Sequence, residues 1–551
     1  MTLSYTPYTS TFKIGGYQEK FDQIVTVPPG SACVASDYQQ QRGWQVVTRR
    51  LTTITSAQHT VTFVPGTTLR TDALSPTGVA QEPRLDTIRV ATAGGTVIRR
   101  FQFAHDYSTG RLTLRSIFER DGTNASSLPP YSFDYSGPTL PAYSATGQDH
   151  WGYFNGVTSN TTLIPPAITP TGAVLTGADR TPDSTFAKAG VLTRITYPTG
   201  GTSEFVYASN DYGAYSGSLT APLGGSAHSI TANSPSGSTG PVNTPFTVGG
   251  SSTVVATVVV ALQPASCGGV GCRYASILGK GMWTTSGTYA VSLPPGSYTA
   301  QASDEYGGAG NSAFIRVDWS DSAVVKKKLA GGLRLAELRT TDAMGATRLQ
   351  RFKYTLQADT TISSGIVSAE PRYSFQFNGG SCRYFSRSTQ SATPLGGGPI
   401  VAYREVTVWD GASGEYGKTR TTFRTVAEAD DDPVPSPLTK WPSFKRTSRE
   451  YKRGQQTSTS TMSSTAVLQQ RQATAYTFKD DAPEDTASTR RYRGISVHYF
   501  SSGAYSSTAA VNAYETVSAW SFPALDSTIV YDTTGANGVA TVRASAYANP
   551  R

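Results

Sequence analysis

The segment from Ala189 to Asn210 has the residue pattern of a complete β-hairpin. Side chains typical of strands occupy every second position from Val191 to Tyr197, and the alternation resumes at Phe205 and Tyr207. A repeat of two is the period of a β-strand, whose successive side chains point to opposite faces. The segment therefore predicts two antiparallel strands joined by a short turn.

The turn of this hairpin lies between Pro198 and Gly201. Pro198 fixes φ and lacks an N–H, so it interrupts the strand. Gly200 and Gly201 can both adopt the positive φ that a tight reversal requires. Variants of this unit recur along the chain, so the sequence predicts a protein built from successive hairpins.

Three later turns combine an aspartate with a glycine, at Asp342–Gly345, Asp410–Gly414 and Asp532–Gly535. In each, the aspartate is expected to bond its own backbone and the glycine to supply the left-handed conformation. We therefore predict Asp342, Gly345, Asp532 and Gly535 to be turn-forming residues. Shaping the backbone, and not chemistry, is the first explanation for these carboxylates.

The predicted fold class is all-β, with successive antiparallel hairpins forming extended or open sheets. Charged residues make up only 15% of the chain, against roughly 25% in typical globular proteins, while 54 Gly and 32 Pro favour turns. A length of 551 residues suggests roughly two to four domains. We predict a β-meander over 1–214, an inserted module over 215–325, and a second hairpin region over 326–551 that leads into a repeat array.

The inserted module is predicted to be a β-sandwich. Residues 216–252 are mostly Ser, Gly, Thr, Pro and Ala, which is typical of a linker or a loop-rich edge. The apolar run from Thr253 to Leu262 has the length of a strand covered on both faces. Alternating strands at 288–302 and 313–319 complete the set, and such modules commonly serve display or binding.

The net charge of +9 does not come from one basic block. Lys326–Lys328 is the only run of three, and it precedes a Gly-Gly turn. Nucleic-acid binding is typically accompanied by a clustered basic face with interleaved aromatic residues on a known module. We therefore expect no nucleic-acid partner.

The hydropathy and the two ends of the sequence predict where the protein is located. No apolar run reaches the about 20 residues that span a bilayer, so we expect no membrane span. The first 16 residues lack the basic and apolar blocks of a secretory signal. Either the protein is cytoplasmic or the chain is cut from a longer precursor, whose other parts would be its partners. We expect the cut, because the last strand pattern stops as it begins to pair.

The chain has four cysteines, too few for a disulfide framework. Cys267 and Cys272 bracket Gly-Gly-Val-Gly, which suits a local disulfide in an oxidising compartment. Two other readings stay open, free thiols or half of a zinc site. Cys33 and Cys382 are single.

The densest cluster of special residues is Asp149-His150-Trp151, followed by Tyr153 and Phe154. Asp149 could orient His150 for base catalysis, but neighbouring residues of a strand point to opposite faces and no nucleophile elbow accompanies them. Local packing of the aromatic residues between sheets is the commoner outcome. An aromatic surface that stacks on sugars or binds a partner is the alternative, in which Trp283 is a further candidate.

The only acidic run is Asp430–Asp432. Calcium could bind such a loop, but the spacing is not that of an EF-hand. A solvated connector is the commoner case, and we predict no catalytic residue, no metal site and no cofactor.

Two segments resemble a repeat motif. Tyr531-Asp532-Thr533-Thr534-Gly535, followed by Tyr547, is similar to the YD repeat of Rhs proteins. The segment from Asp106 to Leu112 is a looser version with the aromatic and acidic residues exchanged.

A longer series resembles the region before the Rhs repeat array in secreted proteins of Bacteroidota. It comprises 149–156, then 197–201 with 204–207, then Gly331-Gly332-Leu333-Arg334, in that order. The resemblance covers about 85–551 in outline. The inserted module is its least similar part.

The resemblance implies a secreted or surface-displayed β-rich protein. In that family the repeats wind a β-ribbon into a wall or shell, in some relatives around a C-terminal toxin or adhesive domain. The aspartate-containing motif that ends an Rhs shell is absent from this sequence, and no toxin-like domain follows. The resemblance therefore implies a scaffold and assigns neither autoproteolysis nor toxicity.

The sequence leaves three hypotheses for function. The first is a non-enzymatic scaffold at the cell surface, for adhesion, assembly or presentation of a C-terminal effector. The second is a protein that binds surface glycans or acts on them through aromatic platforms and paired carboxylates. The third is self-association through exposed strands, because an open edge invites another chain.

Overall fold

The computed structural model is almost entirely β-strand, which confirms the predicted all-β class. It describes residues 1–26, 38–72, 82–125, 128–169, 174–215, 227–238, 240–249, 253–263, 273–304, 311–320, 327–367, 371, 373–379, 382–389, 399–426, 429, 431, 447–478, 490–499, 509–518 and 521–545. Among these residues the only helices are two single turns of 3₁₀ helix, η1 (Phe186–Lys188) and η2 (Glu450–Lys452).

Nineteen strands form one antiparallel sheet, which we call the wall. Its strands are β1 (Thr2–Thr26), β2 (Tyr38–Thr55), β3 (His59–Leu69), β4 (Pro83–Thr92), β5 (Val97–Asp106), β6 (Thr113–Asp121), β7 (Tyr131–Tyr135), β10 (Leu192–Thr196), β11 (Thr202–Tyr212), β21 (Lys328–Thr341), β22 (Thr347–Lys353), β24 (Ser374–Gly379), β25 (Cys382–Ser388), β27 (Glu405–Asp410), β28 (Lys418–Phe423), β29 (Gln456–Met462), β30 (Leu468–Phe478), β33 (Ser521–Tyr531) and β34 (Gly538–Ala544).

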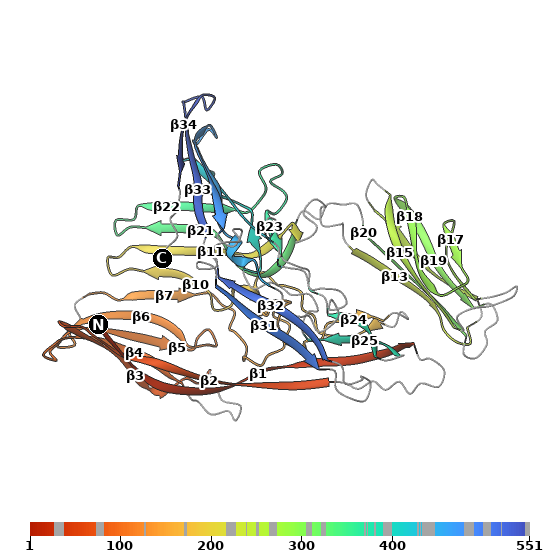
Figure 1. Ribbon diagram of the computed structural model, residues 1–551, viewed down its shortest axis with the longest axis horizontal. Coiled ribbons are helices and arrows are strands. Elements are labelled where there is room, and N and C mark those ends of the chain that lie inside the picture. Colours follow the sequence, from red (N-terminus) through yellow and green to blue (C-terminus); the bar gives the residue numbers. More distant parts are fainter. Residues whose placement is uncertain are drawn as a thin grey trace.

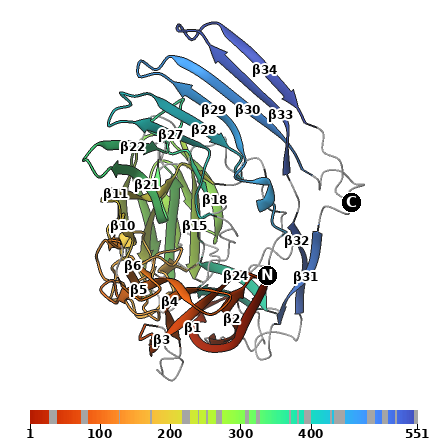
Figure 2. The ribbon, with the colours of Figure 1, turned by 90° about the vertical axis from the view of Figure 1, so that its left-hand side faces the viewer.

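The wall follows the chain almost strand by strand. Pairing runs from β1 through β7 to β10 and β11, then to β21 and β22, and on through β27–β30 to β33 and β34. The hairpin of β24 and β25 is the exception. It follows β22 in the sequence, but β25 pairs with β1, the first strand of the wall. The wall curves along its length, from β1–β3 past β10, β11, β21 and β22 to β33 and β34 (Figure 2).

The module between β11 and β21 consists of two four-stranded antiparallel sheets. Its strands are β13 (Ala227–Ser234), β14 (Gly240–Val248), β15 (Val254–Gln263), β16 (Tyr274–Ile277), β17 (Gly281–Trp283), β18 (Gly287–Leu293), β19 (Gly296–Asp304) and β20 (Ser312–Ser320). One buried apolar cluster draws residues from both sheets, as in a β-sandwich. Figure 1 shows the module to one side of the wall.

Strand β15 differs from the prediction that both of its faces are covered. Val254, Val258 and Leu262 are buried, whereas Val255 between them is 69% exposed. Burial therefore alternates along the strand, with one face in the sandwich core and the other toward solvent. A run of valines favours a strand, but it does not indicate whether one or both faces of that strand are buried.

The remaining strands form small sheets. They are β8 (Ala167–Ile168) with β9 (Val174–Leu175), β12 (Ala214–Tyr215) with β23 (Gly365–Val367) and β26 (Ala402–Tyr403), and β31 (Arg490–Tyr499) with β32 (Ala509–Ser518). The sheet of β12, β23 and β26 lies at a second buried cluster, which includes Tyr212, Ala330, Val367 and Val401.

Backbone conformation at the turns depends on single glycines. Gly200, Gly345 and Gly535 have φ of 87°, 90° and 75°, values that side chains rarely adopt. Gly201, for which a positive φ was also predicted, does not have one. A Cβ at Gly201 would lie 3.0 Å from the Thr341 carbonyl oxygen, so this glycine allows close approach of the neighbouring strand.

The aspartates of two turns accept hydrogen bonds from their own backbone. Asp342 Oδ1 accepts from Met344 N and Ala346 N, both at 2.9 Å. Asp532 accepts hydrogen bonds from the Thr534 hydroxyl and from Thr534 N, the latter to Oδ1 at 3.0 Å. These bonds, that from the hydroxyl most of all, lower the pKa of Asp532. Both carboxylates therefore hold the shape of the turn between two wall strands.

The turn that follows β27 is built differently, and the prediction that Asp410 bonds its own backbone there is wrong. Asp410 Oδ1 accepts from Arg348 and Gln350 of the neighbouring strand. The carboxylate of Glu415 instead accepts from Ala412 N at 2.9 Å and Ser413 N at 2.8 Å. Backbone hydrogen bonds lower the pKa of Glu415 to about 2.

Candidate functional site

The loop from Gln148 to Gly156 is organised by a buried carboxylate. Asp149 is 1% exposed, and its Oδ1 accepts from Trp151 N at 2.8 Å and Tyr153 N at 3.0 Å. Burial raises the pKa of Asp149, against these backbone bonds that lower it. Asp149 therefore shapes the loop, because its Oδ1 is occupied by hydrogen bonds from backbone N–H groups.

Arg180 ties this loop to the segment after β25. Its Nε and Nη2 donate to the Asp149 carbonyl oxygen at 3.2 and 2.7 Å, and its Nη1 donates to the Thr389 carbonyl oxygen at 3.0 Å. The guanidinium lies 5.0 Å from the Tyr373 ring centroid. Because Arg180 is buried, desolvation lowers its pKa, and its hydrogen bonds hold together segments more than 200 residues apart in sequence.

His150 contacts Tyr373 and not the carboxylate of Asp149. The two rings stack with centroids 5.5 Å apart, and His150 Nδ1 lies 3.2 Å from the Tyr373 hydroxyl. Burial lowers the pKa of His150 to about 4 and raises that of Tyr373 to about 12. Both rings are therefore neutral at physiological pH and act as packed, hydrogen-bonded groups.

This burial of His150 predicts a pH dependence of stability. The unfolded chain binds a proton at His150 near pH 6.5, whereas the folded chain binds it only near pH 4. The contribution of His150 is therefore complete above about pH 6.5 and is lost as the pH falls toward 4. In urea titrations between pH 7 and 4, His150→Phe should flatten this dependence, while His59→Phe at an exposed position should leave it unchanged. Equal slopes in all three proteins would contradict the assignment.

The predicted aromatic residues do not form one surface. Trp151 and Tyr153 lie against Gly331 of β21, where an added Cβ would be 2.7 Å from Trp151 Cβ. Phe154 packs edge-on against Phe186 at 5.2 Å. Trp283 lies in the inserted module on β17, 5.4 Å from the Tyr289 ring. Of the four, Tyr153 is 40% exposed.

A second cluster of polar residues lies between β11, β21 and the segments around β23 and β26. Asp211 and Arg334 form a bidentate ion pair, in which Nη2 donates to Oδ2 at 2.5 Å. Ser363 Oγ donates to Asp211 Oδ1 at 2.6 Å, and Arg334 Nη1 donates to the Tyr403 hydroxyl at 3.2 Å. The guanidinium also lies 5.0 Å from the Tyr354 ring centroid, and burial, which lowers the pKa of Arg334, is outweighed by the hydrogen bonds that Arg334 donates to Asp211, which raise it.

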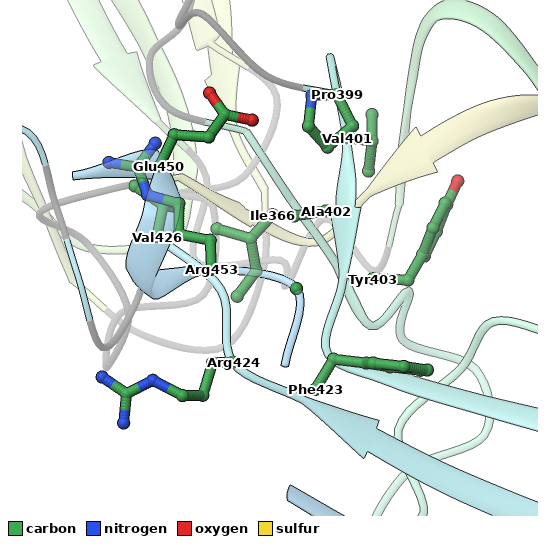
Figure 3. Close-up of a pocket in the computed structure, with 11 residues that line it drawn as sticks. Ile366, Pro399, Val401, Ala402, Tyr403, Phe423, Arg424, Val426, Glu450 and Arg453 are labelled. Atoms are coloured by element: carbon green, nitrogen blue, oxygen red, sulfur yellow. The ribbon is translucent and has the colours of Figure 1, made fainter. Parts of the chain in front are cut away.

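A cavity of about 380 Å³ lies beside this cluster (Figure 3). Its apolar lining includes Ile366, Val401 and Phe423, and its charged lining consists of Arg424, Glu450 and Arg453. Both arginines bond groups around the cavity: Arg424 donates to the Lys452 carbonyl oxygen at 3.1 Å and Arg453 to that of Ala429 at 2.6 Å. Arg424 extends away from Ile366 and Val401 in Figure 3, so the charged groups do not converge.

Several predicted positions lie outside the described residues. These are Cys33, Cys267, Cys272, Asp430 and Asp432. Cys382 begins β25. Asp431 pairs with Arg453, whose Nη2 lies 2.5 Å from Asp431 Oδ1.

The described residues contain no group of three or more His, Cys, Asp or Glu side chains placed to hold a metal ion. Among the same residues, no helix has the length and apolar character needed to cross a bilayer.

The residues that sequence reasoning missed are the buried arginines and their partners. Arg180 and Tyr373 lie far from Asp149 in sequence, and only the fold brings them together. Arg334 alternates with Leu333 and Leu335, which is the pattern of a strand with one face in solvent, so its burial had no signal in the sequence.

No protein-family model matches the sequence, and no curated protein is significantly similar to it.

Proposed function

We propose that the chain is a non-enzymatic scaffold of a secreted or cell-surface protein, similar in design to Rhs or YD-repeat proteins. In this proposal the wall carries the inserted module for adhesion and supports presentation of a C-terminal effector. The observation that supports it best is the wall itself, a 19-stranded antiparallel sheet whose strands follow the chain.

The positions of acidic groups are consistent with a structural task. Asp121, Asp342, Glu415 and Asp532 lie at exposed turn tips and accept hydrogen bonds from backbone N–H groups of their own turns. Such bonds fix the reversal between neighbouring strands. These carboxylates therefore contribute to the regular stacking of hairpins in the wall.

The module is attached in a way that suits display. It leaves the wall after β11 and returns to it at β21, and Tyr212 and Lys328 are direct partners in that pair of strands. Entry and exit therefore lie side by side, so the module can be removed without separating the wall strands. The loops at the ends of a sandwich are its usual binding surfaces.

Excision of the module tests this proposal. Residues 216–326 are replaced by a short glycine-rich turn, and adhesion of beads coated with full chain or excised chain to cell surfaces is counted. We expect the excised chain to keep its β-sheet circular dichroism and lose adhesion. Adhesion that is unchanged without the module, or release of reducing ends from a polysaccharide panel by the full chain, would contradict the proposal.

A further inference from the structure

Basic residues that are far apart in the sequence lie in one row across the wall. The register pairs Lys353 of β22 with Thr407, Thr407 with Arg420 of β28, Arg420 with Ser460, and Ser460 with Arg471 of β30. Directly paired residues project from the same face of a sheet. Lys353, Arg420 and Arg471 therefore share one face.

A second row on the same face adds two cations and an aromatic ring. Arg351 pairs with Trp409, and Trp409 pairs with Lys418, each two residues along its strand from the first row. The Lys353 and Lys418 Nζ atoms lie 5.6 and 5.9 Å from the Trp409 ring centroid. We call the surface formed by Arg351, Lys353, Trp409, Lys418, Arg420 and Arg471 the basic patch.

The charge of the basic patch is largely uncompensated. Arg351 Nε pairs with Glu337 Oε1 at 2.7 Å. Lys353, Lys418, Arg420 and Arg471 form no ion pair with any residue in the described parts of the chain. Glu337 is the direct partner of Arg351 in register, and the next acidic residue on this face is Glu405, whose Oε2 accepts from Gln357 N at 2.7 Å. The face therefore presents a net positive surface to solvent.

The spacing of the row suits a linear ligand. Neighbouring strands lie about 4.8 Å apart, so Lys353 and Arg420, two strands apart, are separated by roughly 10 Å, as are Arg420 and Arg471. The intervening positions carry the small side chains Thr407, which is buried, and Ser460, which is half-buried. An extended polyanion lying across the strands would therefore meet a cation at regular intervals, with no bulky side chain between them.

We propose that the basic patch binds an acidic polysaccharide, a linear sugar chain that bears carboxylate or sulfate groups. The cations match its charges, and the Trp409 ring positions two of them, because the Lys353 and Lys418 ammonium groups lie over it in cation–π contact. Single-stranded nucleic acid fits less well, because such sites typically provide several stacking aromatic residues and the patch has one. This binding goes beyond the proposed function, which assigns adhesion to the inserted module.

The test measures binding of the full chain to heparin, alginate, neutral dextran and a single-stranded DNA oligonucleotide by biolayer interferometry at two salt concentrations. We expect binding to heparin or alginate that weakens with salt, and none to dextran. The triple variant Lys353→Gln, Arg420→Gln, Arg471→Gln should lose affinity by about tenfold or more and show a smaller salt dependence. Trp409→Leu should weaken binding without changing the salt dependence.

A matched variant controls for net charge. Arg49→Gln, Lys280→Gln, Arg543→Gln removes the same three charges at exposed positions outside the basic patch, and it should retain affinity within about twofold. Melting temperatures of both triple variants should match the parent, because the altered side chains make no described ion pair. The proposal is overturned if both variants bind equally, if no acidic polysaccharide binds, or if dextran or DNA binds as tightly. Excision of the module should not change this binding. Adhesion of the full and excised chains to cells is also counted in excess soluble heparin, which occupies the basic patch, so failure of either proposal can be distinguished from failure of the other.

Discussion

Asp211→Ala is expected to lower the free energy of unfolding by about 3–5 kcal/mol, because it leaves the Arg334 guanidinium buried without its counter-ion. The Arg334 and Asp211 side chains are only 18% and 8% exposed, so water cannot replace the lost partner. The variant also removes the nearer of two acceptors of Ser363 Oγ, leaving the Asp211 carbonyl oxygen at 3.1 Å. Chemical denaturation followed by circular dichroism measures the loss.

An exposed ion pair of the same wall is the control. Glu204 lies 3.9 Å from Arg194 and from Arg339, with side chains that are 37–51% exposed. Glu204→Ala should therefore cost less than about 1 kcal/mol. Equal losses in Asp211→Ala and Glu204→Ala would show that the Asp211 cluster is not buried as described.

Leu262→Ala is expected to destabilise the inserted module by about 2–5 kcal/mol. Leu262 is 1% exposed and lies in the cluster shared by the two sheets, so its truncation leaves a cavity. The effect should be local, because this cluster contains residues of the module alone. Hydrogen exchange should therefore speed up in β13–β20 and stay slow in β11 and β21.

The same strand offers a matched control. Val255 is 69% exposed on the opposite face of β15, and Val255→Ala should change stability by less than about 0.5 kcal/mol. If Val255→Ala were as damaging as Leu262→Ala, β15 would be covered on both faces, as its sequence first suggested.

Local features of the fold were predictable from the sequence because they depend on neighbours in the chain. The hairpin of β10 and β11 follows from alternation and from Gly200, whose φ of 87° requires glycine. The turns at Asp342 and Asp532 follow from the side-chain chemistry of aspartate. The role of Glu415 was not predicted, because its carboxylate accepts from N–H groups of residues that precede it in the turn. Asp410, which opens the same turn, was expected to be the acceptor.

Pairings between distant segments were not predictable in the same way. Nothing in the alternation of β1 indicates that its last residues pair with β25, which follows about 360 residues later. The contacts of Arg180 with Asp149 and Thr389 depend on the same long-range arrangement. A single sequence carries no local signal for such contacts, since their geometry is set only when the sheet is complete.

The basic patch was not visible in the sequence, because its residues come from separate strands. Lys353, Lys418, Arg420 and Arg471 come from three strands that are separated in the sequence, so no basic block is visible. Register brings them to one face. Residues from separate strands can thus form one charged surface on a β-sheet, although no short segment of the sequence contains them together.

The wall is continuous across the inserted module only if β11 pairs with β21. Disulfide mapping of these two strands tests this pairing. In a chain whose four cysteines are replaced by serine, Glu204→Cys with Arg339→Cys places two thiols at directly paired positions. Leu338, which pairs with Phe205, points to the other face, so Glu204→Cys with Leu338→Cys is the control. The account predicts rapid oxidation of the 204–339 pair and little of the 204–338 pair, and equal or absent cross-linking in both would contradict it.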